Sequence, residues 1–407
     1  MSRIALVIPG LDRIGGAERQ LLLLARGLHR RGWRVSVVGL SGNGGDAAGE
    51  LIATGIEFLS LRMRKGLADP RGWMHFNRWL RRERPDVVHA HLPHGAWFVR
   101  WSRLGAPVRV VVDRLHSAST GSLGRGLGYR LSGWLPDRVT AVSHAVADTH
   151  LAARMVSKDR LLVLPNGVDV DAWRPDASVR LAVRRELGIG NEFLWFAAGR
   201  LEAVKDYPTL LRAMGTVPEP ARLVIAGGGP LQGELTQLCV SLGLERRVTF
   251  LGFAPDVRRW MQAADGFVLS SRWEGLPMGL LEAAACALPA VATDVAGTRE
   301  TMMALSGKLT SAGDAAELGK AMSATMQTPL EERRRMGENA RRQVVERFSL
   351  EAALDRWETL YADLLRHNPK PRRWAGQPHE RPGLLTANSA TAITGDPGCT
   401  GSDLLIL

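Results

Sequence analysis

Short apolar runs alternate with longer amphipathic stretches along most of this chain. The runs are rich in Val, Ile and Leu and have the length of strands, while the stretches between them show helical periodicity. Runs that are apolar throughout are typical of parallel strands covered on both faces. The strands we expect are 3–10, 33–40, 85–92, 108–115, 138–143, 193–199, 221–228, 247–252, 266–271 and 289–295.

The predicted strands form two groups, and a cluster of turn-forming residues separates them. Pro165, Asn166, Gly167 and Pro175 interrupt the pattern within the segment 164–175. A chain of 407 residues also exceeds one ordinary core. We therefore predict two doubly wound α/β domains, at residues 1–165 and 166–350. Residues 367–407 are rich in Pro, Gly, Ser and Thr without a sustained period, so we expect a disordered tail there.

Glycines follow two of the predicted strands, where parallel sheets bind their ligands. Gly15 and Gly16 stand before a helix, and Gly228 and Gly229 follow the strand 221–228. Backbone N–H groups left bare at such a turn suit a phosphate. An ordinary tight turn has the same signature, and neither stretch is the G-x-G-x-x-G of a nicotinamide oxidoreductase.

Two cations follow the strand 193–199. Arg200 and Lys205 lie in one loop before the next helix, where they could clamp a pyrophosphate, the arginine as a bidentate donor and the lysine as a point charge. The alternative is a solvated loop in which they pair with Glu202 or Asp206.

A carboxylate stands inside an otherwise apolar helix in the stretch RWEGLPMGLLEAAACAL. Pro277 suits the first helical position, and the next three N–H groups are expected to point into a cleft; they belong to Met278, Gly279 and Leu280. Glu282 lies one turn further, where an unpaired carboxylate is costly. Its partner is either a pair of ligand hydroxyls or an arginine elsewhere in the core.

Histidines follow two strands of the first half. His91 and His94 end one of them and His116 another. They could hold zinc, but no carboxylate or thiol lies at ligand spacing nearby, so hydrogen bonding to a sugar or phosphate is the alternative. Asp169-Val170-Asp171 spells D-x-D, yet it lies in the predicted hinge and is interpreted as a turn.

The positive charge is concentrated in the first half. Residues 1–165 hold 25 Lys and Arg against 12 Asp and Glu, within a net charge of +12 for the whole chain. In 69–86 and 94–105 aromatic and basic residues are mixed, which suits an anionic membrane face. The alternative is that the aromatic side chains enter the core. Nucleic acid is a weaker candidate partner, because no recognised binding motif accompanies the charge.

Neither a membrane span nor a disulfide framework is expected. No apolar run approaches the ~18 residues that cross a bilayer, and the first residues lead straight into a strand. The three cysteines are far apart and odd in number. We expect a cytoplasmic protein.

An ordered set of motifs resembles the family-four retaining glycosyltransferases of the GT-B fold. The matching stretches cover roughly residues 5–366 and are GGAER, VVHAHLPH, LPNGVD, GRLEAVKDYPTLLRA, AGGGPL, LGFAPDV and EGLPMGLLE. The resemblance implies two Rossmann-like domains facing a cleft, with the first binding the acceptor and the second the nucleotide-sugar. It also implies that helix 351–366 crosses back to the first domain.

The resemblance implies a role for each matching residue. Glu282 would hold the ribose hydroxyls, Glu274 would face the donor sugar, and His116 would sit beside that sugar. Arg200 and Lys205 would neutralise the diphosphate, whose cradle Gly16 and the N–H groups near Gly279 would complete. No metal or other cofactor is expected, since stabilising the departing diphosphate is the main work.

The function we predict is transfer of a hexose or N-acetylhexosamine with retention, from a nucleotide-sugar that in this family is most often a UDP-sugar. Aromatic and basic residues together would suit an acceptor on a polyprenyl diphosphate, at the inner face of the cytoplasmic membrane. Such an enzyme would serve exopolysaccharide or lipopolysaccharide synthesis. A soluble small-molecule acceptor is one alternative, and a non-catalytic nucleotide-sugar-binding protein is another.

Overall fold

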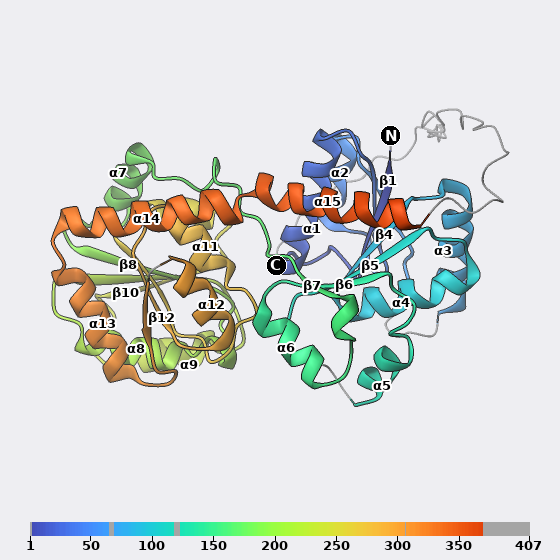
Figure 1. Ribbon diagram of the computed structural model, residues 1–407. Coiled ribbons are helices and arrows are strands. Elements are labelled where there is room, and N and C mark those ends of the chain that lie inside the picture. Colours follow the sequence, from blue (N-terminus) through green and yellow to red (C-terminus); the bar gives the residue numbers. More distant parts are fainter. Residues whose placement is uncertain (1, 65–68, 118–122, 306, 369–407) are drawn as a thin grey trace, which may run out of the picture. The chain divides into compact units, whose positions relative to one another are not determined.

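Two parallel β-sheets, one in each half of the chain, form the framework of the protein. The computed structural model describes residues 2–64, 69–117, 123–305 and 307–368. The first sheet has the order β3-β2-β1-β4-β5-β6-β7 and the second β10-β9-β8-β11-β12-β13 (Figure 1). Both orders place the first strand of a half in the interior of its sheet and reverse there, as in Rossmann-like domains. The predicted tail lies, from residue 369 onward, outside the described residues.

The first sheet lies within residues 1–165. Its strands are β1 (Arg3–Ile8), β2 (Arg34–Gly39), β3 (Glu57–Ser60), β4 (Val87–His91), β5 (Val110–Leu115), β6 (Arg138–Ala141) and β7 (Leu161–Val163). The connecting helices are α1 (Gly16–Arg30), α2 (Gly45–Ala53), α3 (Pro70–Glu83), α4 (Leu92–Gly105), α5 (Leu123–Leu131) and α6 (His144–Ala152), with a short 3-10 turn at Lys158–Arg160. Apolar side chains fill both faces, because the central strands are buried on each side.

The second sheet lies within residues 166–350. Its strands are β8 (Phe193–Ala198), β9 (Ala221–Ala226), β10 (Val248–Gly252), β11 (Gly266–Leu269), β12 (Ala290–Thr293) and β13 (Lys308–Thr310). Its helices are α7 (Ala177–Glu186), α8 (Tyr207–Thr216), α9 (Gln232–Ser241), α10 (Val257–Ala263), α11 (Met278–Ala285), α12 (Ala296–Leu305), α13 (Ala315–Gln327) and α14 (Leu330–Phe348), and a 3-10 turn spans Ala203–Lys205.

The last described helix, α15 (Leu350–His367), packs on the first sheet although it follows the second in sequence. It lies beside α1 (orange-red against blue in Figure 1) and joins the core of the first half through Leu354, Trp357 and Tyr361. The hinge segment runs against its start, where a β-carbon on Gly167 would lie 2.8 Å from the Leu350 Cα. Only a glycine allows the two chain segments to approach this closely.

The ten predicted strands are all present, and the structure adds β3, β7 and β13. These three form sheet edges and have three or four residues each. An edge strand is covered less than a central one, so its sequence lacks the long apolar run that identifies the others.

Candidate functional site

The strand-end loops after β8 and β9 are packed against each other. A β-carbon on Gly229 would lie 2.5 Å from the Leu201 carbonyl oxygen, and the Leu201 N–H donates to the Gly228 carbonyl at 3.0 Å. The absence of a side chain at Gly229 therefore already serves packing. A β-carbon on Gly228 would have only the Phe253 nitrogen within 4.0 Å, so a ligand would have room to approach the backbone there.

Lys205 and Glu274 form a close ion pair at the centre of the candidate site. Lys205 Nζ lies 2.5 Å from Glu274 Oε1, and the Ser271 hydroxyl donates to the same oxygen at 2.6 Å. Glu274 is only 8% exposed, so both partners hold its carboxylate in a fixed position. Ser271 was not among the predicted site residues, although its place at the end of the predicted strand 266–271 was a usable signal.

Arg200 lies apart from this pair. Its side chain is 77% exposed, and its NH1 lies 2.9 Å from Glu202 Oε1. This is the solvated pairing considered as the alternative for Arg200. An exposed pair of this kind contributes little, so the side chain can exchange Glu202 for an anionic ligand at small cost.

The turn that carries Glu274 touches the first half of the chain. Ser143 Oγ donates to the Gly275 carbonyl at 2.6 Å, and a β-carbon on Gly275 would lie 2.9 Å from the His116 carbonyl oxygen. The backbone next to Glu274, from the second half, therefore lies against the backbone at His116, from the first. Only a glycine at position 275 permits this approach.

Glu282 is nearly buried on α11 and faces a cation from the other half. Arg19 NH1 lies 3.7 Å from its Oε1. Burial raises the pKa of Glu282 to about 7, and the charge of Arg19 opposes that rise. Arg19 was missed by the sequence analysis, although it belongs to the GGAER motif.

The start of α11 offers fewer N–H groups than expected. The helix begins at Met278, with Pro277 as its N-cap, and the Leu280 N–H donates to the Pro277 carbonyl at 3.0 Å. Met278 and Gly279 are the first two helical residues, whose N–H groups precede intrahelical pairing. A β-carbon on Gly279 would lie 3.0 Å from the Phe267 ring, so this glycine also serves packing.

The glycine pair before α1 is arranged as a helix cap. The Gly15 N–H donates to Glu18 Oε2 at 3.0 Å, which places a carboxylate at the helix start. A β-carbon on Gly16 would have no atom within 4 Å, so the space beside it is open. An anion bound at Gly16 would have to share the helix N-terminus with Glu18.

The histidines lie in a row at the ends of β4 and β5. His91 Nδ1 lies 3.1 Å from His116 Nε2, and His89 Nδ1 lies 2.8 Å from the Tyr361 hydroxyl. Burial lowers the pKa of His89, His91 and His116 well below 6.5, and Arg114 adds to this. All three are therefore neutral at physiological pH. His91, predicted with His94 for the acceptor side of the cleft, is buried, and its ring stacks on that of His116 with the centroids 5.3 Å apart. His94 is half-buried in the first turn of α4.

No group of three or more His, Cys, Asp or Glu side chains suited to a metal occurs among the residues that the structure describes. Asp169 Oδ1 accepts the N–H groups of Asp171 and Ala172 at 3.2 and 3.0 Å. The D-x-D sequence thus builds a turn, as predicted.

The aromatic residues of α3 correct the expected membrane face. Phe76, Trp79 and Leu80 are buried in the core, so the alternative interpretation holds for them. The exposed face of this helix carries Met74 and arginines, namely Arg71, Arg78, Arg81 and Arg82. Within the described ranges no helix is both long and apolar enough to cross a membrane.

Both halves of the chain match known glycosyltransferase families. Residues 14–172 match the family described as Glycosyltransferase Family 4, and residues 179–343 match the family described as Glycosyl transferases group 1.

Curated relatives cover most of the chain. An N-acetyl-alpha-D-glucosaminyl L-malate synthase of Bacillus anthracis is 30% identical over 298 residues, which is 70% of this chain and 76% of that protein. A UDP-Gal:alpha-D-GlcNAc-diphosphoundecaprenol alpha-1,3-galactosyltransferase of Escherichia coli is 24% identical over 314 residues, covering 74% and 81% respectively.

The fold is also that of a solved structure, Anabaena HepE in complex with UDP and glucose. The TM-score is 0.79 at 22% identity, over 88% of this chain and 99% of the other. The predicted family and the predicted pair of Rossmann-like domains are both confirmed. This chain therefore belongs to the glycosyltransferases of group 1 and family 4, with the GT-B fold.

Proposed function

We propose that the protein transfers a hexose or N-acetylhexosamine from a UDP-sugar, with retention, to a growing oligosaccharide on a polyprenyl diphosphate. The observation that carries this is the Lys205–Glu274 pair, whose charged atoms lie 2.5 Å apart on the loops after β8 and β11, with the backbone at Gly275 close to the His116 carbonyl. An ammonium held in place by a buried carboxylate suits a leaving group that gains negative charge. The Escherichia coli relative is named for a UDP-sugar and a diphosphoundecaprenol acceptor, which supports both substrate classes.

In this proposal the two halves of the chain bind different substrates. The first domain holds the acceptor, and the second holds the donor through Glu282 at the ribose and Lys205 at the diphosphate. Arg200 leaves Glu202 to join the diphosphate, so neutralisation is assigned to these two cations rather than to a metal ion. Gly16, Gly228 and the N–H groups of Met278 and Gly279 line the path of the phosphates.

The sugar is transferred on the face that the diphosphate leaves. The bond between the anomeric carbon and the diphosphate oxygen breaks, the acceptor hydroxyl bonds to the same face of that carbon, and its proton passes to the departing phosphate oxygen. Glu274 and the neutral His116 orient the sugar, while His94 faces the acceptor side. The Lys205 ammonium stabilises the diphosphate as its charge grows.

A soluble acceptor is the second candidate, and two observations favour it. The Bacillus anthracis relative is named for L-malate, and it is more similar in sequence, at 30% identity, than the Escherichia coli relative at 24%. The buried aromatic residues of α3 also remove one argument for a membrane-bound acceptor.

The donor and the acceptor can be tested separately with the purified full-length chain. UDP-sugars are expected to raise its melting temperature and GDP-sugars are not, because binding only to the folded state stabilises it. The UDP-sugar that stabilises most is then incubated with an undecaprenyl-diphosphate-linked N-acetylhexosamine or with soluble hydroxy acids. Transfer to the lipid supports the first candidate, and transfer only to the hydroxy acid supports the second.

The pKa of Glu282 gives a prediction for donor binding. The carboxylate must be ionised to accept two ribose hydroxyls, and its pKa is about 7. The affinity for a UDP-sugar should therefore rise about tenfold between pH 6 and pH 8, as the ionised fraction grows. Glu282→Gln should bind more weakly and show no such rise. Calorimetric titration with a UDP-sugar measures both, and an equal pH dependence in the variant would contradict the assignment.

As pH rises, the free energy of unfolding of the ligand-free protein should fall, whereas the affinity for the donor should rise. The pKa of Glu282 in the folded protein, about 7, lies above the ordinary value of a glutamate carboxyl, about 4.5. Its contribution to the free energy of unfolding is therefore fully present below about pH 4.5 and is lost as pH rises through about 7. Glu282→Gln should remove this part of the pH dependence in urea titrations.

Membrane association, if the first candidate holds, would use what we call the Trp134 surface. It consists of the exposed side chains Leu104, Leu131 and Trp134 together with Arg103, Arg130 and Arg160. Arg160 NH1 donates to the Trp134 and Pro136 carbonyls at 2.9 and 2.7 Å, which ties the strand edge to this loop. Exposed tryptophan beside arginines suits the boundary of an anionic leaflet.

Replacing the tryptophan should weaken binding to anionic vesicles. In Trp134→Ala we expect the partition coefficient for phosphatidylglycerol vesicles to fall about tenfold, since one aromatic side chain no longer inserts. Met303 on α12 is 76% exposed, so Met303→Ala is the matched control and should bind normally. Vesicle flotation at low salt measures this, and equal flotation of both variants would exclude the Trp134 surface.

A further inference from the structure

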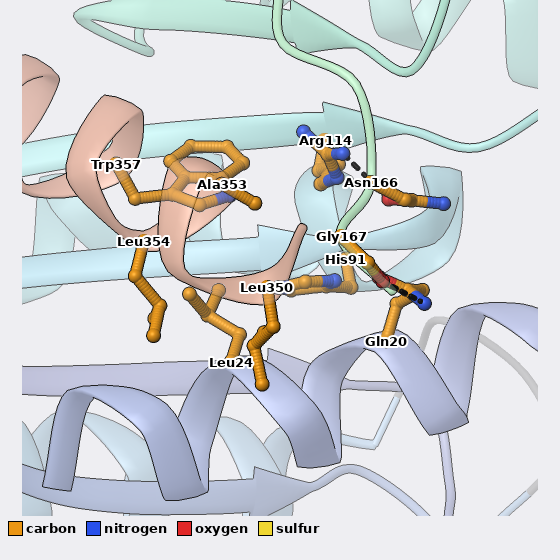
Figure 2. Close-up of a pocket in the computed structure, with 10 residues that line it drawn as sticks. All are labelled: Gln20, Leu24, His91, Arg114, Asn166, Gly167, Leu350, Ala353, Leu354 and Trp357. Carbon is orange, nitrogen blue, oxygen red and sulfur yellow. Dashed lines mark hydrogen bonds between the residues drawn. The ribbon is translucent and has the colours of Figure 1, made fainter. Parts of the chain in front are cut away.

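A small cavity lies between α1, α15, the hinge segment and the ends of β4 and β5. Its volume is about 20 Å³, which holds a single water-sized particle. Figure 2 shows the lining side chains, which are Gln20, Leu24, His91, Arg114, Asn166, Gly167, Leu350, Ala353, Leu354 and Trp357. Five of these side chains are apolar or aromatic, and four are buried and polar, namely Gln20, His91, Arg114 and Asn166.

Arg114 brings a positive charge into this cavity without a carboxylate partner. Its side chain is 2% exposed. NH2 donates to the Leu164 carbonyl at 2.9 Å and to Asn166 Oδ1 at 2.6 Å, and the guanidinium carbon lies 4.7 Å from the centre of the Trp357 ring. Among the described residues NH1 has no hydrogen-bond partner, and no ion pair to Arg114 is found.

A buried cation of this kind is costly unless an anion lies near it. Burial lowers the pKa of Arg114 to about 9; the charge of Arg356 contributes to this fall, and Tyr361 opposes it. At neutral pH the guanidinium is still charged. Asn166 and the ring of Trp357 offer dipoles but no net negative charge, so the charge itself is uncompensated by the side chains that line the cavity.

His91 supplies a second donor to the same cavity. It is 1% exposed, and its Nε2 has no hydrogen-bond partner within the described part of the chain. Its Nδ1 lies 3.1 Å from His116 Nε2. When Nδ1 accepts a hydrogen bond from His116, Nε2 must carry the proton of the neutral ring and becomes a donor.

We propose that the cavity binds one monatomic anion of about the size of chloride, held by Arg114 NH1 and by the Nε2–H of His91. A water molecule would satisfy these two donors but would leave the charge of Arg114 uncompensated. A volume of about 20 Å³ suits one monatomic ion better than it suits phosphate or sulfate. The apolar side chains of Leu24, Leu354 and Trp357 complete a wall that suits a large, weakly hydrated ion.

The anion would also fix the hydrogen-bond direction at His116. An anion accepts only, so it requires a proton on His91 Nε2, which leaves His91 Nδ1 to accept from His116 Nε2–H. The His116 Nδ1 then carries a lone pair and can accept from a sugar hydroxyl. This consequence rests on the proposed role of His116, whereas the anion site itself does not.

The binding test uses thermal unfolding of the full-length chain without any substrate. Sodium chloride is titrated against sodium gluconate at constant ionic strength and at pH 7.5. The melting temperature should rise with chloride and saturate, by about 5 °C at a concentration a hundredfold above Kd. Arg299→Gln, which removes an exposed arginine paired with Asp294, should show the same rise. A melting temperature that does not depend on chloride would overturn the proposal.

Asn166→Asp is the decisive variant, since it places a carboxylate where Asn166 Oδ1 already accepts from Arg114. The aspartate supplies a negative charge beside Arg114 and keeps an oxygen that accepts the Arg114 hydrogen bond. Its melting temperature in gluconate should reach at least that of the unaltered chain in chloride, and chloride should have no further effect. A chloride response equal to that of the unaltered chain would contradict the site. Crystals soaked in sodium bromide should show anomalous scattering in the cavity, and density for water alone there would overturn the proposal.

Discussion

Lys205→Met is expected to lower kcat for sugar transfer by about 10²- to 10³-fold, with a smaller change in KM. Lys205 Nζ lies 2.5 Å from Glu274 Oε1, so the ammonium is positioned before the donor binds. In the proposed reaction it meets charge that grows as the diphosphate leaves. Removing one such preorganised donor typically costs this much in rate. The effect falls on kcat, because the interaction strengthens in the transition state.

Loss of Lys205 should also lower the stability of the protein, and this effect must be distinguished from the effect on the rate of sugar transfer. Glu274 is nearly buried and, among the residues that the structure describes, its side chain would keep Ser271 alone as a partner, at 2.6 Å. We expect the variant to lose about 1–3 kcal/mol of unfolding free energy. The double variant Lys205→Met/Glu274→Gln should recover much of that stability without recovering activity. Recovery of both together would assign the pair a structural role only.

Arg100→Met is expected to destabilise the first domain by about 3–5 kcal/mol. Arg100 Nε lies 2.6 Å from Asp113 Oδ2, and both side chains are inaccessible to solvent. NH1 also donates to the Tyr129 carbonyl at 2.8 Å, and the guanidinium carbon lies 3.6 Å from the centre of the Tyr129 ring. Removing the cation would leave the Asp113 carboxylate buried and unpaired. Urea unfolding measures the loss.

The deficit of Arg100→Met should depend on pH. Burial raises the pKa of Asp113 even with Arg100 present, and the variant removes the charge that opposes this rise. A carboxyl whose folded pKa is raised loses its stability contribution as pH increases. The variant should therefore be less impaired at pH 5 than at pH 8. Arg100→Met/Asp113→Leu is the control, because replacing both partners avoids the unpaired charge. A deficit independent of pH would contradict this account.

The sequence predicted the central strands well because each is buried on both faces. The missed strand Leu161–Val163 shows the limit, since three residues at a sheet edge cannot produce a recognisable run. The buried aromatic residues of α3 show another limit. A helix with aromatic and basic residues has the same sequence pattern whether its aromatic side chains face a membrane or the core. Only the packing of the folded chain shows which of the two they face.

The candidate site was predictable where a motif lies at a strand end. Lys205 and Glu274 are 69 positions apart, and their pairing follows only from the loops after β8 and β11 meeting at one edge of the sheet. The approach of Arg19 to Glu282 depends on contacts between the two halves, for which the sequence holds no local signal. The cavity beside Arg114 likewise requires α15, which is more than 200 residues away in the chain.

The most direct test of the proposed reaction is real-time NMR of UDP-sugar turnover by the unaltered chain. Water and an undecaprenyl-diphosphate-linked N-acetylhexosamine serve in turn as acceptor, and the configuration of the sugar formed first is recorded. We predict release of UDP and a product with the α configuration of the donor. UDP-sugars that bind without being turned over, or a first product of β configuration, would contradict a retaining transferase.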